Sequence, residues 1–251
     1  MIIQLTRQQN LAKERLYIAL DGLNINEANN AIDMLAPYVN FKIGMEMFTA
    51  YGQDILNKVK SKSAKIFLDM KYHDIPTTVG KALYQATKLG VDIINVHASG
   101  GSIMMMEAVN QRDKALSEMG KNIESSPDLI AVTVLTTIDQ DQFNDELLLP
   151  GLIEHYVLHL AKLSYQCGMD GIVCSAKDLD LINNELPDNF LRITPGIRFA
   201  EDNSDDQIRI LPPNQAIRVG ATHLVVGRPI MKSKTPVQSA IKFLDAIALE
   251  L

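Results

Sequence analysis

The segment KIFLDMKYHDIPTTV, residues 65–79, contains the start of a strand-to-helix unit, and this unit decides the fold. Its first part, residues 65–71, is an apolar run that is too short for a typical helix and ends in charged side chains. A proline at position 76 then opens a second part, which continues to Leu89 and stops before Gly90. Proline near the first turn and glycine after the last are typical of a helix. The segment therefore predicts a β-strand followed by an α-helix.

Further apolar runs share this character, and with the first they predict eight strands. Each run is rich in Val, Ile, Leu or Phe and is nearly continuous in hydrophobicity, which is typical of strands covered on both faces. A longer segment of helical character follows each run, so strand and helix alternate strictly. The runs are LYIALD (16–21), YVNFKIG (38–44), KIFLDMK (65–71), DIINVHA (92–98), LIAVTVL (129–135), GIVCS (171–175), LRITPGI (191–197) and HLVVG (223–227).

Eight such units in 251 residues predict an α/β fold, a (β/α)8 TIM barrel that forms a single domain. We expect this domain to span residues 1–251, with residues 1–15 as an N-terminal helical extension. A doubly wound open sheet is the alternative, but it usually carries a glycine-rich turn after its first strand. Here that turn reads DGLN, residues 21–24, and contains no GxGxxG. The stretches 136–150 and 200–213 are expected to be loops.

Composition and charge exclude several classes of protein. The chain has 24 Lys plus Arg against 30 Asp plus Glu, a net charge of −6, and it contains no basic tract of the kind that grips nucleic acid. Its apolar runs fall far short of the ~20 residues that span a bilayer, and its polar N-terminus shows no apolar signal segment. Cys167 and Cys174 are too few for a disulfide framework. We therefore expect a cytoplasmic protein with no membrane or nucleic-acid partner.

Polar side chains stand at the ends of the predicted strands, where the chemistry of an α/β barrel gathers. Asp69 and Lys71 are two residues apart, so on an extended strand they point to the same side. With Lys42 they suggest an array of alternating ammonium and carboxylate groups that is close to neutral overall. A structural salt-bridge network at the barrel rim is the alternative. The polar residues at strand ends are Asp21, Lys42, Asp69, Lys71, His97, Thr136, Arg198 and Arg228.

The pair Gly227-Arg228 follows the last strand and suggests a phosphate site. Loops after the last two strands form the common phosphate cradle of barrel enzymes. Glycine lets a ligand approach backbone N–H groups, and arginine offers a bidentate partner to phosphate. A surface arginine after a turn is the alternative.

Several of these segments, among them FLDMKYHDIPTTV and VVGRPI, resemble in order and spacing the bacterial orotidine 5′-phosphate decarboxylase family. The resemblance extends from about Leu16 to the C-terminus, and its most specific part is the D-x-K-x-x-D-I-P-x-T segment from Asp69 to Thr78. It implies a homodimeric (β/α)8 barrel with no metal and no organic cofactor. It also implies the reaction that converts orotidine 5′-phosphate to UMP, the last step of de novo pyrimidine nucleotide synthesis.

The resemblance further implies a role for each matching residue. The Lys71 ammonium stabilises a carbanion at C6 of the pyrimidine and then protonates it. Asp74, Ile75 and Thr78 reach into the site of the neighbouring subunit. The implied catalytic residues are Lys42, Asp69, Lys71 and Asp74. At the ribose the implied contacts are Asp21 and Lys42, and at the pyrimidine amide the implied contact is Thr136. At the phosphate they are Gln207, Gly227 and Arg228, with Arg198 close to that end. Ile75 and Thr78 are further implied substrate contacts.

Three other functions compete with this interpretation. A related sugar-phosphate decarboxylase or hexulose-phosphate synthase shares the fold and the DxKxxD motif but uses Mg²⁺, and the Pro76-Thr77-Thr78 continuation and the missing extra acidic ligand argue against it. A Schiff-base aldolase needs an unprotonated lysine, whereas flanking carboxylates keep Lys42 and Lys71 protonated. A non-catalytic phosphate-binding module would need Arg228 alone and none of the charges at 69–74.

Overall fold

The computed structural model of the protein describes residues 3–122, 127–200 and 211–251. Its strands pair in chain order and close into a barrel in which β8 lies beside β1 and parallel to it, which confirms the predicted (β/α)8 fold. Each strand lies inside its predicted run or exceeds it by one residue. The strands are β1 (Leu16–Ala19), β2 (Asn40–Gly44), β3 (Ile66–Tyr72), β4 (Ile93–His97), β5 (Asp128–Val132), β6 (Gly171–Val173), β7 (Leu191–Pro195) and β8 (His223–Val226).

The helices follow the strands as the alternation predicts. The Thr-Pro pair at residues 235–236 predicts a capped start for the last helix; Pro236 is indeed its first residue, but the side chain of Thr235 forms no cap hydrogen bond. No helix in the described ranges is both long and apolar enough to cross a bilayer. The α-helices are α1 (Arg7–Glu14), α2 (Ile25–Leu35), α3 (Met45–Lys60), α4 (Pro76–Lys88), α5 (Gly101–Glu118), α6 (Ile153–Gln166), α7 (Leu179–Asn183), α8 (Pro213–Arg218), α9 (Arg228–Met231) and α10 (Pro236–Ala248).

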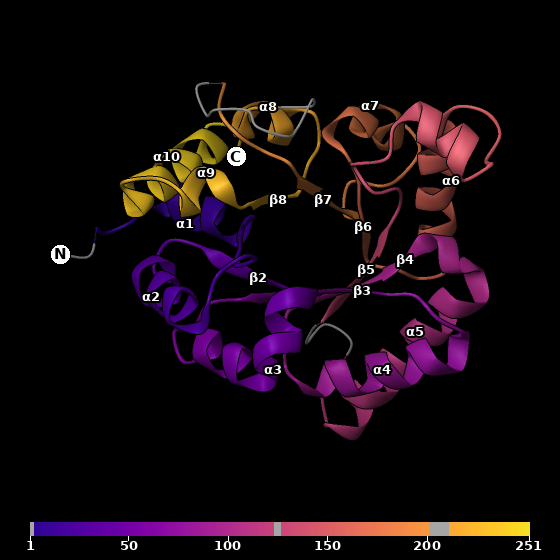
Figure 1. Ribbon diagram of the computed structural model, residues 1–251, viewed down its shortest axis with the longest axis horizontal. Coiled ribbons are helices and arrows are strands. Elements are labelled where there is room, and N and C mark those ends of the chain that lie inside the picture. The colour runs from indigo at the N-terminus through magenta and orange to yellow at the C-terminus, as the bar shows by residue number, and fades with distance from the viewer. Residues whose placement is uncertain (1–2, 123–126, 201–210) are drawn as a thin grey trace. The chain divides into compact units, whose positions relative to one another are not determined.

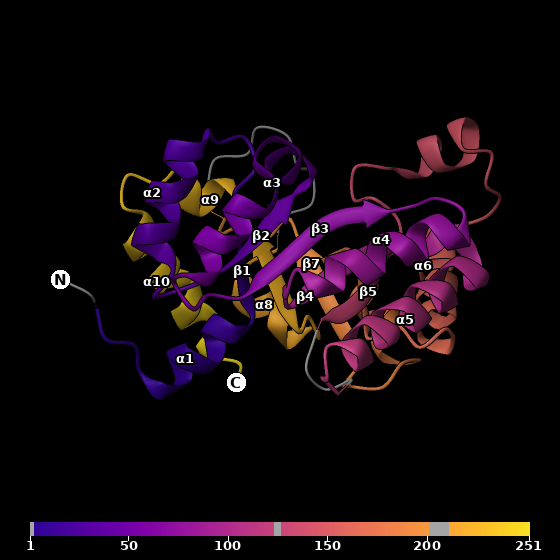
Figure 2. The same ribbon diagram turned by 90° about the horizontal axis from the view of Figure 1, so that it is seen from below.

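The chain divides into two compact units, of which the first comprises Met1–Asp69 with Thr194–Leu251 and the second Met70–Ile193. The span of a single domain over residues 1–251 stays a prediction. In the first unit β2 is buried at every position, as expected for a strand covered on both faces. Helices α1 and α10 lie side by side in Figures 1 and 2, and Gln9 of α1 donates to Asp245 of α10 at 2.7 Å.

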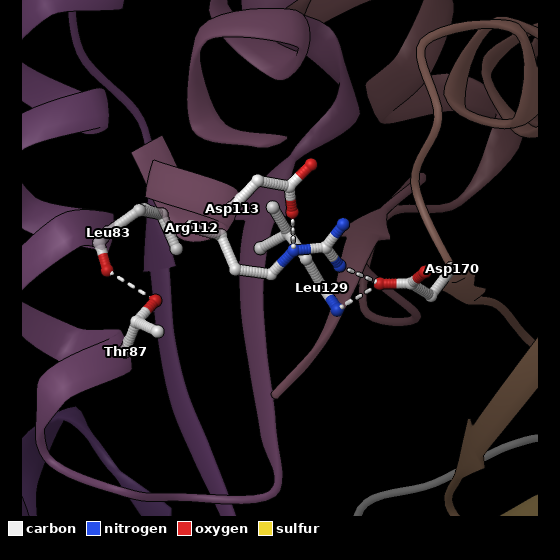
Figure 3. A network of polar contacts seen from close by, with 6 residues as sticks. All are labelled: Leu83, Thr87, Arg112, Asp113, Leu129 and Asp170. Carbon is white, nitrogen blue, oxygen red and sulfur yellow. Dashed lines mark hydrogen bonds and ion pairs between the residues drawn. The ribbon is translucent and has the colours of Figure 1, made fainter. Parts of the chain in front are cut away.

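In the second unit α4 and α5 run side by side (Figure 2). They approach closely because Gly80 of α4 carries no side chain, and a Cβ there would lie 2.8 Å from the Glu107 side chain of α5. Arg112 of α5 is 4% exposed and contacts the carboxylates of Asp113 and Asp170 (Figure 3). Asp170 also accepts the N–H of Leu129 at 2.7 Å, so these contacts tie α5 to the starts of β5 and β6.

Two stretches expected to be loops differ in outcome. Residues 136–150 contain a π-helix, Gln142–Glu146, in which the side chain of Phe143 is fully buried. That part of the loop prediction is wrong. Most of the stretch 200–213 lies outside the described residues.

Candidate active site

In the first unit the structure brings Asp21, Lys42 and Asp69 together. Lys42 lies in the middle of β2, Asp21 follows the end of β1, and Asp69 stands on β3. The Lys42 ammonium nitrogen lies 2.7 Å from Asp21 Oδ2 and 3.1 Å from Asp69 Oδ2. The side chains of Lys42 and Asp69 are each only 9% exposed, whereas that of Asp21 is 42% exposed. The cluster is therefore buried on one side and open to a ligand at Asp21.

The two carboxylates keep Lys42 charged. Burial on its own lowers the pKa of Lys42, but the nearby charges and hydrogen bonds of Asp69 and Asp21 outweigh it, so the pKa is raised above its ordinary value. A lysine in this state donates hydrogen bonds and fixes the two carboxylates. It is unsuited to attack a carbonyl as a neutral amine, which argues against the Schiff-base alternative at this position.

Gly44, the last residue of β2, is a site residue that sequence reasoning missed. A Cβ at this position would lie 2.8 Å from Lys42 Nζ and closer still to Asp21 Oδ1. Any side chain would therefore displace the ion pair. The signal was present, because a glycine within a buried strand often marks a close approach of other groups to the backbone.

The predicted phosphate residues of the first unit lie beyond β7 and β8. Gly227 and Arg228 directly follow β8, Arg228 begins α9, and its side chain is exposed. Arg198 lies beyond the end of β7, is 5% exposed, and donates its backbone N–H to Leu211 at 3.4 Å. Gln207 lies outside the described residues.

In the second unit Lys71 has an unusual backbone. Its φ is 51°, in the left-handed region, so the alternation that places residues 69 and 71 on one side of an extended strand ends at Lys71. Its N–H donates to Oδ1 of Asn95 on β4 at 2.7 Å. Sequence reasoning also missed Asn95, whose amide stands inside the apolar run of β4.

The residues expected to reach a neighbouring subunit lie together at the start of α4. Asp74 and Thr78 are exposed, and Asp74 accepts the N–H of Ile75 at 2.6 Å. Ile75 is 65% exposed, which is unusual for a large apolar side chain. A groove of about 500 Å³ adjoins them and is lined by Pro76, Thr77, Ile103, Met106, Glu107 and Asn110.

Thr136 is not at the end of β5, contrary to the prediction. The strand ends at Val132, and Thr136 lies exposed in the turn beyond it. Thr133, the next residue, donates both its backbone N–H at 3.2 Å and its hydroxyl at 2.9 Å to the carbonyl of Val173 on β6. The predicted polar end of β4 is confirmed at His97, whose ring lies 5.3 Å from that of His73 between centroids.

No group of three or more His, Cys, Asp or Glu able to hold a metal ion occurs among residues 3–122, 127–200 and 211–251. The two carboxylates of the candidate site, Asp21 and Asp69, both contact the ammonium group of Lys42.

Comparisons with known proteins agree on one family. The family profile described as "Orotidine 5'-phosphate decarboxylase / HUMPS family" matches residues 14–243. The orotidine 5′-phosphate decarboxylase of Idiomarina loihiensis is 42% identical over 238 residues, which cover 94% of this chain and 99% of that protein. The enzyme of the same name from Staphylococcus haemolyticus is 43% identical over 227 residues, covering 90% of this chain and 95% of that one. The crystal structure of orotidine 5′-phosphate decarboxylase from Lactobacillus acidophilus has a TM-score of 0.80 and 34% identity, and covers 93% of this chain and 98% of that chain.

Proposed function

The chain belongs to the orotidine 5′-phosphate decarboxylase / HUMPS family, and we propose that it converts orotidine 5′-phosphate to UMP through a carbanion at C6. Its similarity to relatives named orotidine 5′-phosphate decarboxylase, at 42% and 43% identity, identifies it within this family as a carboxy-lyase of pyrimidine nucleotide biosynthesis. The observation that carries the proposal is the buried ion pair of Lys42 and Asp69, because such costly charges are concentrated at sites where fixed charges act on a ligand.

The proposed chemistry uses fixed charges. The bond between C6 and the carboxylate breaks, CO2 leaves, and the electron pair stays on C6 in the plane of the ring, where the π-system cannot delocalise it. The Lys71 ammonium stabilises this carbanion and transfers a proton to C6, and the resulting amine regains a proton from solvent. Asp69 lies against the substrate carboxylate and disfavours the ground state. Lys42 and Asp74 hold the positions of these charges.

The remaining predicted residues bind the nucleotide in this proposal. Asp21, open to solvent beside Lys42, holds the ribose hydroxyls together with that lysine. Thr136 contacts the pyrimidine amide from its turn. The phosphate is bound by Gln207, Gly227 and Arg228, with Arg198 nearby. Binding energy from the phosphate, remote from C6, then supports the chemical step.

We also propose a homodimer in which Asp74, Ile75 and Thr78 complete the site of the neighbouring subunit. The exposed apolar side chains beside Asp74 support it, because Ile75 is 65% exposed, Ile103 69% and Met106 45%. Ile103 and Met106 line the groove at α4 and α5, and a second copy of the chain would cover all three side chains.

The reaction as proposed needs no metal and no organic cofactor, because the ammonium of Lys71 supplies both the charge and the proton. We place the enzyme in the cytoplasm, where its nucleotide substrate and two cysteine thiols are expected.

The decisive experiment adds the purified protein to orotidine 5′-phosphate with excess EDTA and follows the ultraviolet absorbance of the substrate. We expect the absorbance to fall and UMP to appear in equal amount with released CO2. Loss of orotidine 5′-phosphate only after Mg²⁺ is restored would overturn the metal-free mechanism. Binding of UMP without any turnover of orotidine 5′-phosphate would favour the non-catalytic phosphate module.

A further inference from the structure

The backbone of Lys71 is held against its own preference. Its φ of 51° lies in the left-handed region, although the residue is next to last on β3. Glycine adopts this region freely, whereas an L-residue crowds its Cβ against the adjoining carbonyl oxygen. Only Ser63, Lys71 and Leu148 adopt positive φ among the non-glycine residues that the structure describes. Such conformations persist where the surroundings impose them, and they are concentrated at functional sites.

Asn95 is the neighbour that holds this backbone. Its Oδ1 accepts the Lys71 N–H at 2.7 Å, and the residue is 0% exposed between Ile94 and Val96 on β4, which are equally buried. A buried amide is costly unless it is hydrogen-bonded, and a hydrogen bond in such surroundings is both strong and directional. The contact therefore fixes the direction of the Lys71 N–H bond and, with it, the rotation about φ.

We propose that Asn95 is a positioning residue that holds Lys71 in the left-handed conformation and thereby aims its ammonium group at C6. The inference rests on the proposed function, in which Lys71 donates the proton. Glycine, which would adopt this backbone without strain, carries no ammonium, so the reaction requires a lysine in a glycine-like conformation. The direction of the Cα–Cβ bond decides where the ammonium arrives, and it changes when φ returns to negative values.

A purely structural role for Asn95 is the competing explanation, and the chain offers a matched control for it. Asn40 on β2 is 1% exposed, and its Oδ1 accepts the N–H of Lys65 at 3.1 Å. Its Nδ2 donates to the carbonyl of Lys13 at 3.0 Å. Asn40 thus joins segments of the chain as Asn95 does, but it holds no residue of the proposed catalytic set.

The kinetic experiment compares Asn95→Leu with Asn40→Leu in the full-length protein. Thermal unfolding, UMP affinity and steady-state decarboxylation are measured for both variants. We expect both to unfold at lower temperature than the parent, and only Asn95→Leu to lose kcat, by about 100-fold. KM and UMP affinity should stay within about threefold in both, because the groups that bind the nucleotide are unchanged. A kcat of Asn95→Leu within about threefold of the parent, or an equal loss in Asn40→Leu, would overturn the proposal.

A second experiment needs no activity and therefore separates this inference from the proposed function. Urea unfolding is compared for Lys71→Gly and Lys71→Ala, each with Asn95 present and with Asn95→Leu. Within a strand alanine is ordinarily the more stable of the two, but at a positive φ glycine should be. We expect the glycine variant to have the higher urea midpoint when Asn95 is present, and this advantage to disappear with Asn95→Leu.

Greater stability of the alanine variant in the presence of Asn95 would overturn the inference even if the protein decarboxylates orotidine 5′-phosphate. An advantage for glycine that is unchanged by Asn95→Leu would overturn the role of Asn95. A parent protein without decarboxylase activity would instead overturn the proposed function, while these stability comparisons would still report on the hydrogen bond between residues 71 and 95.

Discussion

Asp69 Oδ2 lies 3.1 Å from the ammonium nitrogen of Lys42, and each of these side chains is only 9% exposed. Two opposite charges taken out of water remain stable there only while each has a partner, because the cost of desolvation is large and its compensation is local. Asp21, the second partner of Lys42, is far more exposed than Asp69, so it can exchange this contact for one with a ligand. The fixed carboxylate is therefore Asp69, and the adaptable one is Asp21.

The variant Asp69→Asn tests this difference. It removes the buried partner of Lys42, and we expect the free energy of unfolding at pH 7 to fall by about 1–3 kcal/mol, with Asp21 limiting the loss. The pKa of Lys42 is raised in the folded protein, so the pair stabilises the fold fully below the unfolded pKa, and this stabilisation is lost as the pH rises through the folded pKa. Urea unfolding at pH 7 and pH 11 measures both effects. A difference between parent and variant that does not shrink at pH 11 would contradict the assignment.

Replacement of Lys71 by alanine should remove nearly all turnover and leave nucleotide binding measurable. The ammonium is both the electrostatic stabiliser and the proton donor in the proposed mechanism, so we expect kcat to fall at least about 10⁴-fold. Lys65→Ala is the control, because Lys65 precedes the same strand and pairs at the surface with Glu14 at 2.5 Å. Steady-state decarboxylation and calorimetric titration with UMP give the two readouts. Substantial activity in Lys71→Ala would show that another group protonates C6.

A mixture of Asp74→Ala and Lys71→Ala chains should regain activity that neither has alone. If Asp74 acts in the neighbouring subunit, a mixed dimer contains one intact site, and random exchange should restore roughly a quarter of the parent activity. The two chains are mixed with different tags, and both subunit exchange and decarboxylation are followed. Proven exchange without recovered activity would place Asp74 in the site of its own chain.

Gly44→Ala tests the close approach of Asp21 and Lys42 to the end of β2. The new methyl group would lie 2.8 Å from Lys42 Nζ, so the ion pair has to move and the ribose hydroxyls lose their partners. We expect kcat/KM to fall about 10- to 100-fold, mainly through KM. Gly52→Ala is a useful control, because a Cβ there meets nothing within 4 Å while its φ of 55° strains any other residue. It should lower stability and preserve KM, and equal kinetic losses in the two variants would refute a specific role for Gly44.

These residues show how far the sequence alone could lead. The buried run of β2 predicts a strand, and a lysine inside it predicts a partner, so Lys42 and Asp69 follow from the cost of burying a charge. The place of Thr136 could not be predicted, because the apolar pattern continues to Leu135, whereas the strand ends at Val132 and Thr136 lies in the turn beyond it. The positive φ of Lys71 could not be predicted either, because a backbone angle leaves no trace in composition or spacing when the residue is not glycine.

Asn95 was missed for a related reason. An asparagine inside an apolar run is ordinarily interpreted as a polar interruption of the core, and only the three-dimensional contact shows that it serves Lys71. The most informative residues beyond the motif are thus buried polar groups whose partner is a backbone atom. Such groups can be recognised from the sequence as unusual, but their partners cannot be named from it.

His223 at the start of β8 should make the protein less stable in mild acid. Its ring lies 6.0 Å from that of Tyr17 between centroids, and its Nδ1 lies 3.0 Å from the hydroxyl of Thr222. The pKa of His223 is lowered from 6.5 to about 4, mainly by burial. The charges of Arg15 and Lys65 add to this lowering, and together they exceed the opposing effect of Glu14. The unfolded chain therefore binds a proton between pH 6.5 and about 4 that the folded chain does not.

The free energy of unfolding should consequently fall as the pH drops through this window, by on the order of 3 kcal/mol, and the contribution should level off below about pH 4. Urea unfolding at pH 7, 5 and 4 measures the slope for the parent, for His223→Gln and for His155→Gln. The imidazole of His155 is exposed on α6, so its replacement should leave the acid slope unchanged, while His223→Gln should flatten it. An acid slope that survives in His223→Gln would mean that another group takes up the proton on unfolding.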